Sequence, residues 1–252
     1  MAITSNKAAG RTHALLLAGG LGTRLQPLTL TVPKCLVPIG GKTLLDYWID
    51  NLTRAGVDYA RINTHHLAPL VRQEIADINS KGGLKLDDSP EPTLLGSAGT
   101  VSNNSDLADG ATDVLIIYSD NLSDVDLADF LAYHRAQQAP LTMLLFHATN
   151  PSACGIAELD TNNTIINFVE KPEHPKSDLA NAGLYALSAD AYREIVEMGG
   201  FDLAFDVLPK FIGRMKGYIF DGYHRDIGNL DSLRQAEDDV KSGVFRSTST
   251  DR

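Results

Sequence analysis

A glycine-rich loop near the start of the chain carries residue types suited to binding an anion. The loop Gly19–Arg24 (GGLGTR) follows the apolar run His13–Ala18, and Lys34 lies ten residues after it. Glycines let backbone N–H groups approach an anion closely, and arginine presents a planar fork of donors to phosphate oxygens. The loop is not a P-loop, because no Gly-Lys-Ser/Thr follows, and Leu25 stands where a dinucleotide fingerprint has its third glycine. We therefore expect a phosphate site of another kind.

The distribution of charge supports an anion site in the same region. The chain has 22 Lys and Arg against 32 Asp and Glu, a net charge of −10, which argues against general nucleic-acid binding. Residues 1–45 nevertheless carry +5 and no acidic residue, so the remaining 207 residues carry −15. The five basic residues of this stretch are Lys7, Arg11, Arg24, Lys34 and Lys42.

Strands and helices must position these groups, and in the first half of the chain they alternate. The pattern predicts strands at His13–Ala18, Arg61–Thr64, Val114–Tyr118 and Leu141–Ala148, and helices at Leu44–Ala55, Leu67–Asn79 and Leu127–Gln138. For the second half we expect strands at Ile156–Leu159, Thr164–Val169, Leu184–Leu187 and Tyr218–Phe220, and helices at Ala189–Met198, Phe205–Met215 and Leu230–Lys241. Such alternation predicts an α/β fold: one Rossmann-like domain with a mostly parallel mixed sheet flanked by helices. We place this domain at residues 13–241, between flexible segments at 1–12 and 242–252.

Composition excludes several other classes of protein. The hydrophobic share of 43% and charged share of 21% are those of an ordinary globular protein. No apolar run approaches the roughly 20 residues of a spanning helix, and the polar start is not a secretory signal. Cys35 and Cys154 match no metal-ligand spacing. We expect a cytoplasmic protein that binds neither membrane nor nucleic acid, and the sequence leaves a homodimer open.

A longer signature surrounds the glycine-rich loop. The segment Leu15–Tyr47 (LLLAGGLGTRLQPLTLTVPKCLVPIGGKTLLDY) resembles that of the sugar-1-phosphate nucleotidyltransferases, also called nucleotide-sugar pyrophosphorylases. Further motifs resemble those of the family in the same order: Leu95–Thr100, Ser119-Asp120, Phe168–Pro172, Asn181–Tyr185 and Asp226–Gly228. Each motif alone is weak, but six in order are specific. The resemblance implies the nucleotide-diphospho-sugar transferase fold and looks closest to mannose- and heptose-1-phosphate guanylyltransferases.

The resemblance also implies roles for individual residues. Arg24 and Lys34 would grip the triphosphate of a nucleotide, and Asp120 and Asp226 would hold Mg²⁺. Lys171 would anchor the phosphate of a sugar 1-phosphate. Arg24, Lys34, Asp120 and Lys171 form the implied catalytic set.

Two further groups would contact the substrates themselves. The sugar phosphate would be faced by Gly155, Glu170, Lys171 and Asn181. The nucleotide would be enclosed by Leu17, Ala18, Gly19, Gly20, Gly22, Thr23, Gly96, Ser97, Ala98 and Gly99.

The implied reaction joins a nucleoside triphosphate, expected to be GTP, to mannose-, heptose- or a related cyclitol 1-phosphate. GTP is expected because thymidylyltransferases usually carry serine where Leu21 stands, and because Ser97, Ala98 and Gly99 leave room for a purine. The alternatives are a uridylyl- or thymidylyltransferase acting on another hexose 1-phosphate, a glycosyltransferase, or a non-catalytic nucleotide-sugar sensor. The left-handed β-helix of some relatives is not expected after the closing helix.

A few positions either differ from the family's usual residues or have an alternative interpretation. Cys35 replaces the proline usual after the signature lysine, and Ser119 replaces the glycine usual before the metal aspartate. Asp226 has a structural alternative, in which it pairs with Arg225 or a nearby lysine or caps the final helix. His224 has a position from which it could touch a phosphate.

Overall fold

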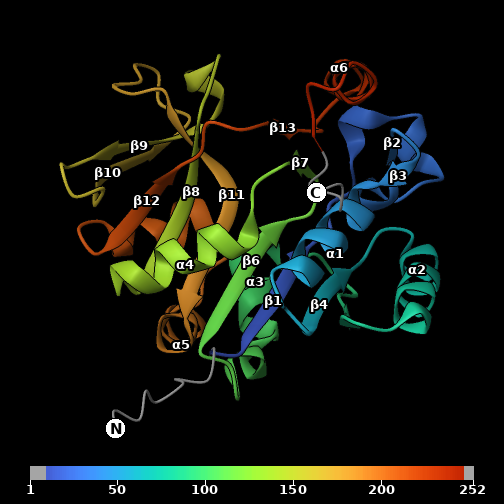
Figure 1. Ribbon diagram of the computed structural model, residues 1–252, viewed down its shortest axis with the longest axis horizontal. Helices are drawn as coiled ribbons and strands as arrows, with labels where there is room; N and C mark the ends of the chain where they lie inside the picture. The colour runs from blue at the N-terminus through green and yellow to red at the C-terminus, as the bar shows by residue number, and fades with distance from the viewer. Residues whose placement is uncertain (1–9, 247–252) are drawn as a thin grey trace, which may run out of the picture.

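The computed structural model describes residues 10–246 (Figure 1). The main strands are β1 (Thr12–Leu17), β4 (Tyr59–Thr64), β5 (Lys85–Pro90), β6 (Asp113–Tyr118), β8 (Leu141–His147), β9 (Gly155–Leu159), β10 (Ile165–Glu170), β11 (Leu179–Ser188) and β12 (Met215–Ile219). The α-helices are α1 (Leu44–Arg54), α2 (Ala68–Lys81), α3 (Gly96–Asn103), α4 (Leu127–Gln137), α5 (Ala189–Met198) and α6 (Leu230–Lys241). Two short ribbons pair β2 (Pro38–Ile39) with β3 (Lys42–Thr43), and β7 (Asn121–Ser123) with β13 (His224–Asp226).

Within the described residues the main strands form one nine-stranded sheet in the order β10-β9-β11-β6-β1-β4-β5, with β8 beside β11 and β12 beside β8. β1 lies between β4 and β6 and pairs with both in parallel. Within this sheet only β10 and β11 run against the common direction. The predicted α/β fold with a mostly parallel mixed sheet is confirmed.

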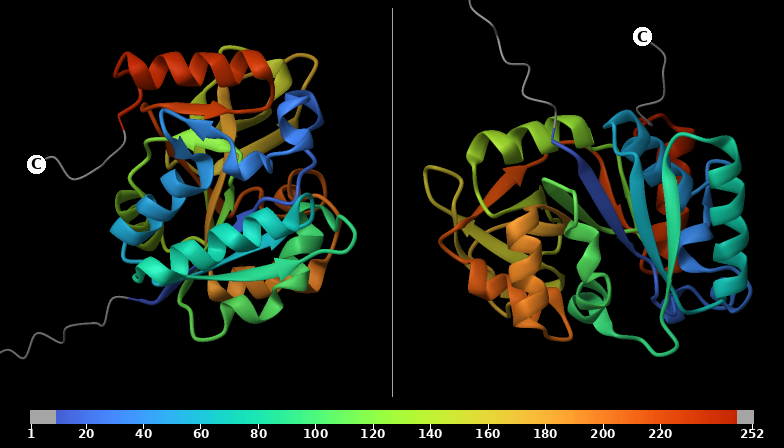
Figure 2. Two further views of the ribbon diagram at one scale, coloured as in Figure 1. Left: turned by 90° about the vertical axis from the view of Figure 1, so that its right-hand side faces the viewer. Right: turned by 90° about the horizontal axis from the view of Figure 1, so that it is seen from below.

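Helices cover both faces of the sheet because successive side chains of a buried strand point to opposite sides. Ala14 and Leu16 of β1 belong to one core cluster with apolar residues of α1, α2 and α4. Leu15, between them, belongs to a second cluster with apolar residues of α3 and α5. Figure 2 (right) shows α4 on one side of the sheet and α3 and α5 on the other.

Residues next to helix α1 determine where it begins and ends. The Thr43 hydroxyl accepts a hydrogen bond from the Asp46 N–H at 3.0 Å, and the Asp46 carboxylate accepts one from the Thr43 N–H at 2.9 Å. This reciprocal pair is a capping box. Gly56, with φ of +75°, follows the helix, and a glycine adopts that conformation without strain.

The predicted helix at Phe205–Met215 is wrong. A single π turn covers Leu203–Val207, a 3₁₀ turn covers Leu208–Phe211, and Met215 already begins β12. Pro209 explains the break, because proline lacks the N–H that a continuing helix needs. β5 and α3 are elements that the sequence analysis did not predict.

The ordered structure extends beyond the expected domain boundaries, since Thr12 begins β1 and Phe245 is buried. Phe245 belongs to a third core cluster, which joins β2, α1, β7 and α6. Its ring lies 5.2 Å from that of Tyr47 and 5.3 Å from that of Tyr223, both edge-on. Residues 1–9 and 247–252 of the expected flexible segments lie outside the described residues. Within residues 10–246, no helix combines the length and apolar character needed to cross a bilayer.

Phe245→Ala should lower the free energy of unfolding by about 3 kcal/mol, because truncating a buried phenylalanine loses its packing and leaves a cavity. Urea denaturation measures the change. The control is Val244→Ala, whose side chain is 60% exposed, and it should change stability by less than about 0.5 kcal/mol. Equal stability of the two variants would show that the segment after α6 does not contribute to the core.

Candidate functional site

The carboxyl ends of the four parallel strands β1, β4, β5 and β6 meet at one edge of the sheet. Leu17, Asn63, Glu91 and Asp120 lie within two residues of these four ends. In open α/β sheets this edge is where ligands bind. Among the described residues, two cavities open here, a first cavity of about 340 Å³ and a second of about 320 Å³.

The first cavity is lined by backbone and side chains of both predicted nucleotide loops. The lining residues are Leu17, Gly19, Gly20, Asn63, Glu91, Leu94, Gly96, Ser97, Thr100, Tyr118, Asp120, Phe201 and Asp202. Five of the ten residues expected to enclose the nucleotide are therefore brought together here.

The other five expected nucleotide residues lie beside the first cavity and do not line it. Ala98 is fully buried in the core, and Gly99 follows it in helix α3. The segment Gly96–Gly99 is thus the first turn of a helix and not a loop. Gly22, with φ of +62°, precedes the 3₁₀ turn that begins at Thr23. The Ala18 N–H donates to Asn63 Oδ1 at 2.6 Å.

A buried polar network forms one wall of the first cavity. Asn63 Oδ1 accepts the N–H groups of Ala18 and Gly19, and its Nδ2 donates to Glu91 Oε1 at 3.0 Å. The Thr100 hydroxyl donates to the same Glu91 oxygen at 2.6 Å. Glu91 Oε2 accepts one long bond, from the Leu95 N–H at 3.3 Å. This network could not be predicted from the sequence, because its members become neighbours only when β4, β5 and α3 pack together.

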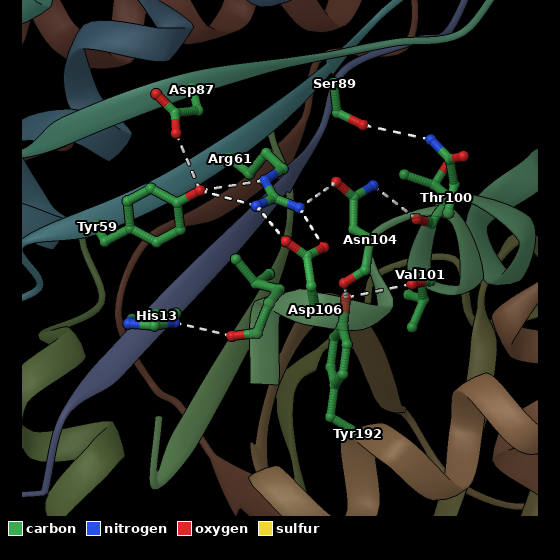
Figure 3. Close-up of polar contacts among 12 residues, drawn as sticks. His13, Tyr59, Arg61, Asp87, Ser89, Thr100, Val101, Asn104, Asp106 and Tyr192 are labelled. Atoms are coloured by element: carbon green, nitrogen blue, oxygen red, sulfur yellow. Dashed lines mark hydrogen bonds and ion pairs between the residues drawn. The ribbon is translucent and has the colours of Figure 1, made fainter. Parts of the chain in front are cut away.

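The far end of α3 is anchored by a second network (Figure 3). The Arg61 guanidinium donates to both carboxylate oxygens of Asp106, at 2.7 and 3.0 Å, and to Asn104 Oδ1 at 3.2 Å. Asn104 in turn donates to the Thr100 carbonyl at 2.8 Å. The Tyr192 hydroxyl of α5 donates to the Asn104 carbonyl at 3.0 Å. These bonds fix the helix whose N-terminal turn borders the first cavity.

The second cavity is lined by all of the residues predicted to face a sugar phosphate or a metal, and by Arg24. Arg24, Asp120, Gly155, Glu170, Lys171, Asn181 and Asp226 all line it. Tyr118, Asp120 and Asp202 line both cavities, so the two are adjacent. Residues from six separate parts of the chain thus converge at one place.

Asp120 and Asp226 are brought together by the β7–β13 ribbon. β13 pairs with β7 so that Asp226 lies opposite Asn121, and the Ile227 N–H donates to the Asp120 carbonyl at 3.1 Å. Lys34 Nζ contacts both carboxylates, at 2.6 Å from Asp120 and 3.6 Å from Asp226. Burial and the negative charge of Asp120 raise the pKa of Asp226, and Lys34 and Arg24 oppose the rise.

The structural alternative for Asp226 as a helix cap is wrong. Helix α6 is capped by Asn229, whose side chain accepts the Ser232 N–H at 2.9 Å. Arg225 pairs with Asp239 at 3.0 Å and not with Asp226. A lysine does pair with Asp226, but it is Lys34, which contacts Asp120 as well.

Glu170 and Lys171 lie side by side at the end of β10. Burial raises the pKa of Glu170, and Lys171, with its Nζ 3.8 Å from the Glu170 carboxylate, opposes the rise. A Cβ on Gly155 would clash with this carboxylate and with the Phe168 ring, so glycine is needed there. Lys171 has φ of +50°, a strained value for a non-glycine residue, and such strain is concentrated at functional sites.

His224 lines the second cavity from β13. Its ring stacks at a tilt on Phe146, with centroids 4.6 Å apart, and burial lowers its pKa to about 4. Among residues 10–246, its Nδ1 is the one buried side-chain nitrogen or oxygen without a hydrogen-bond partner. A contact between His224 and a phosphate stays a prediction.

Most of the chain is similar to a known protein family. The family model described as "Nucleotidyl transferase" matches residues 13–243. A mannose-1-phosphate guanylyltransferase of Mycobacterium tuberculosis is 29% identical over 241 residues, covering 94% of this chain and 67% of that protein. A glucose-1-phosphate adenylyltransferase of Fervidobacterium nodosum is 30% identical over 242 residues, covering 86% of this chain and 58% of that protein. The chain therefore spans about three fifths to two thirds of the length of these relatives.

A solved structure shares the fold. The putative glucose-1-phosphate thymidylyltransferase of Bacillus anthracis superposes with a TM-score of 0.81 at 22% identity, covering 90% of this chain and 94% of that one. The three relatives are named for three different nucleobases.

Thr100→Val should lower the free energy of unfolding by about 1.5–3 kcal/mol, because the buried Glu91 carboxylate loses a hydrogen bond that nothing replaces. Thr100→Ser keeps the hydroxyl and is the matched control. Urea denaturation of both variants measures the difference. If valine and serine at this position gave the same stability, the hydroxyl would be dispensable to the network.

Proposed function

The chain belongs to the nucleotidyl transferase family, and we propose that it transfers a nucleoside monophosphate from a nucleoside triphosphate to a sugar 1-phosphate, releasing pyrophosphate. The observation that carries the proposal is the convergence of Lys34, Asp120 and Asp226 where two adjacent cavities share a wall. The first cavity suits a nucleoside, and the second suits a sugar phosphate. A reaction between their ligands would occur at the shared wall.

The proposed reaction needs no protein nucleophile. A phosphate oxygen of the sugar 1-phosphate attacks the α-phosphorus, and the bond from this phosphorus to the bridging oxygen of pyrophosphate breaks. The attacking phosphate is already ionised at pH 7, so no general base is required. The protein must instead align two anionic reactants and offset their repulsion. Arg24, Lys34 and Lys171 supply the fixed positive charge.

The residues present fit a bound Mg²⁺. Among the described residues, no three or more His, Cys, Asp or Glu side chains are arranged so that together they could hold a metal ion, but Asp120 and Asp226 converge. Mg²⁺ is characteristically held by one or two carboxylates together with substrate phosphates. Asp120 and Asp226 would hold the ion, which when bound neutralises charge on the phosphates. Lys34, in contact with both carboxylates, would add positive charge beside the ion.

Lys171 is the proposed anchor for the phosphate of the sugar 1-phosphate. It lines the second cavity, and its backbone is held in its strained conformation by an N–H bond to the Cys154 carbonyl at 2.9 Å. Glu170 and Asn181 present polar groups in the same cavity, as binding of a sugar requires. Mannose, heptose or a related cyclitol 1-phosphate remains our proposal for the second substrate.

Glu91 supports guanine as the preferred base. A carboxylate accepts hydrogen bonds, and guanine presents two adjacent N–H donors, on N1 and N2. Adenine places an acceptor at N1, and thymine flanks a single donor with two acceptors. Glu91 lies in the wall of the first cavity, and its Oε2 accepts only the 3.3 Å bond from Leu95 among the described residues.

GTP should give the highest kcat/KM among the five common nucleoside triphosphates. The experiment crosses these nucleotides with a panel of sugar 1-phosphates and follows pyrophosphate release. Release that depends on a sugar 1-phosphate supports the proposed reaction. A higher kcat/KM for any of the other four nucleotides across the panel would make the guanine assignment wrong while leaving the transfer reaction in place.

Lys171→Ala should raise the KM for the sugar phosphate much more than the KM for the nucleotide. A lysine–phosphate contact is a charge-assisted hydrogen bond of about 1.5–3 kcal/mol, so the increase should be roughly tenfold to a hundredfold. Lys176→Ala, a nearby lysine with an exposed side chain, is the matched control. Equal effects of Lys171→Ala on both substrates would mean that this lysine is merely structural.

Asp120→Asn and Asp226→Asn should both fold and both lose most activity, with kcat lower by on the order of 10²-fold or more. Chelation with EDTA should abolish turnover of the unmodified protein. Thermal melting checks that both variants are folded. A folded Asp226→Asn protein with near-normal kcat at saturating Mg²⁺ would leave Asp120 as the sole carboxylate ligand.

A further inference from the structure

Two phenylalanines of one turn are exposed to an unusual degree. Phe201 and Phe205 have 62% and 63% of their surfaces exposed, although burying a phenylalanine side chain gains free energy. They lie in the connection between α5 and β12, four residues apart. Aromatic rings held in water at the mouth of a cavity are candidates for ligand contact.

The backbone that carries these rings is fixed, so their exposure does not come from a loose loop. The Asp206 carboxylate accepts the N–H groups of Phe201 and Asp202, both at 2.8 Å. The Asp202 carboxylate accepts those of Ala204 and Phe205, at 2.8 and 3.2 Å. The turn is thus closed by two carboxylates of its own residues.

The same turn is bonded to helix α3. The Phe201 carbonyl accepts the Ala98 N–H at 3.0 Å, and the Ser97 hydroxyl accepts the Leu203 N–H at 2.8 Å. A Cβ on Gly96 would come within 2.9 Å of two Phe201 ring carbons, so this glycine allows the ring its position. The turn and the N-terminal turn of α3 therefore form one rigid unit.

The two rings belong to different cavities. Phe201 lines the first cavity, and Phe205 lines the second. Asp202, between them in sequence, lines both. One turn therefore presents one aromatic ring to each proposed substrate.

We propose that Phe201 stacks on the nucleobase and that Phe205 packs against the C–H face of the sugar ring. This assignment rests on the proposed function for the identity of the two ligands. A phenyl ring has no hydrogen-bonding group, so it recognises a flat or apolar face, and every nucleobase has such a π-face. A pyranose has one apolar face and a rim of hydroxyls. In the second cavity Phe205 would contact the apolar face, and the polar groups of Glu170 and Asn181 would bind the hydroxyls.

The test uses Phe201→Ala and Phe205→Ala as controls for each other, since the two rings are equally exposed and lie on the same turn. Calorimetry measures the Kd of Mg²⁺–GTP and of mannose 1-phosphate for each variant. Phe201→Ala should raise the Kd of GTP at least about 5-fold and leave that of mannose 1-phosphate within about twofold. Phe205→Ala should do the reverse, by a similar factor. Phe201→Tyr and Phe205→Tyr retain the ring and should restore binding.

The outcomes separate this proposal from the proposed function. If Phe201→Ala weakens binding of GTP alone and Phe205→Ala weakens binding of mannose 1-phosphate alone, the assignment of the rings is supported. This holds even if no pyrophosphate is released and the transfer reaction is thereby rejected. Equal effects of each variant on both ligands, or no effect on either, overturn the assignment, even in an enzyme that turns over normally. Thermal melting of both alanine variants should be unchanged, and a large loss of stability would show that the rings are structural.

Discussion

The pairing of β13 with β7 is the contact on which the site depends. It sets Asp226 beside Asp120, although the two residues are about a hundred positions apart in the sequence. Asn121 of β7 is the junction, since its backbone carbonyl accepts the indole N–H of Trp48 in α1 and its side chain donates to the Ala182 carbonyl of β11. The ribbon is thereby held on two sides by elements of the main core.

Two carboxylates that converge in a partly buried place repel each other, and the chain offsets this repulsion with cations from its first 45 residues. Lys34 contacts both carboxylates, and the Arg24 guanidinium packs so closely on Gly228 that a Cβ there would lie 3.1 Å from it. Two basic residues of the acid-free segment therefore have a structural explanation. Arg24 and Lys34 lie beside carboxylates contributed by the middle and the end of the chain.

The sequence predicted those parts of the fold that local pattern determines. The apolar runs of β1 and β6 and the helical spacing of α1 are local features, and these elements form where they were expected. β5 (KLDDSP) was missed because its polar composition hides a strand at the edge of the sheet, and α3 (GSAGTVSN) because two glycines and small residues give no helical periodicity. Neither a pattern nor a motif predicted Asn63 and Glu91 as site residues, because the hydrogen bond between them forms only in the folded structure.

The position of β11 between β6 and β9 has a consequence for how the chain reaches this structure. As the polypeptide leaves the ribosome, β6 emerges well before the strand that covers its free side, because β8, β9 and β10 must be made first. Until residue 188 has emerged, the apolar edge of β6 is open to pairing with another chain. Nascent molecules therefore pass through an interval of exposure to aggregation that the finished protein no longer has.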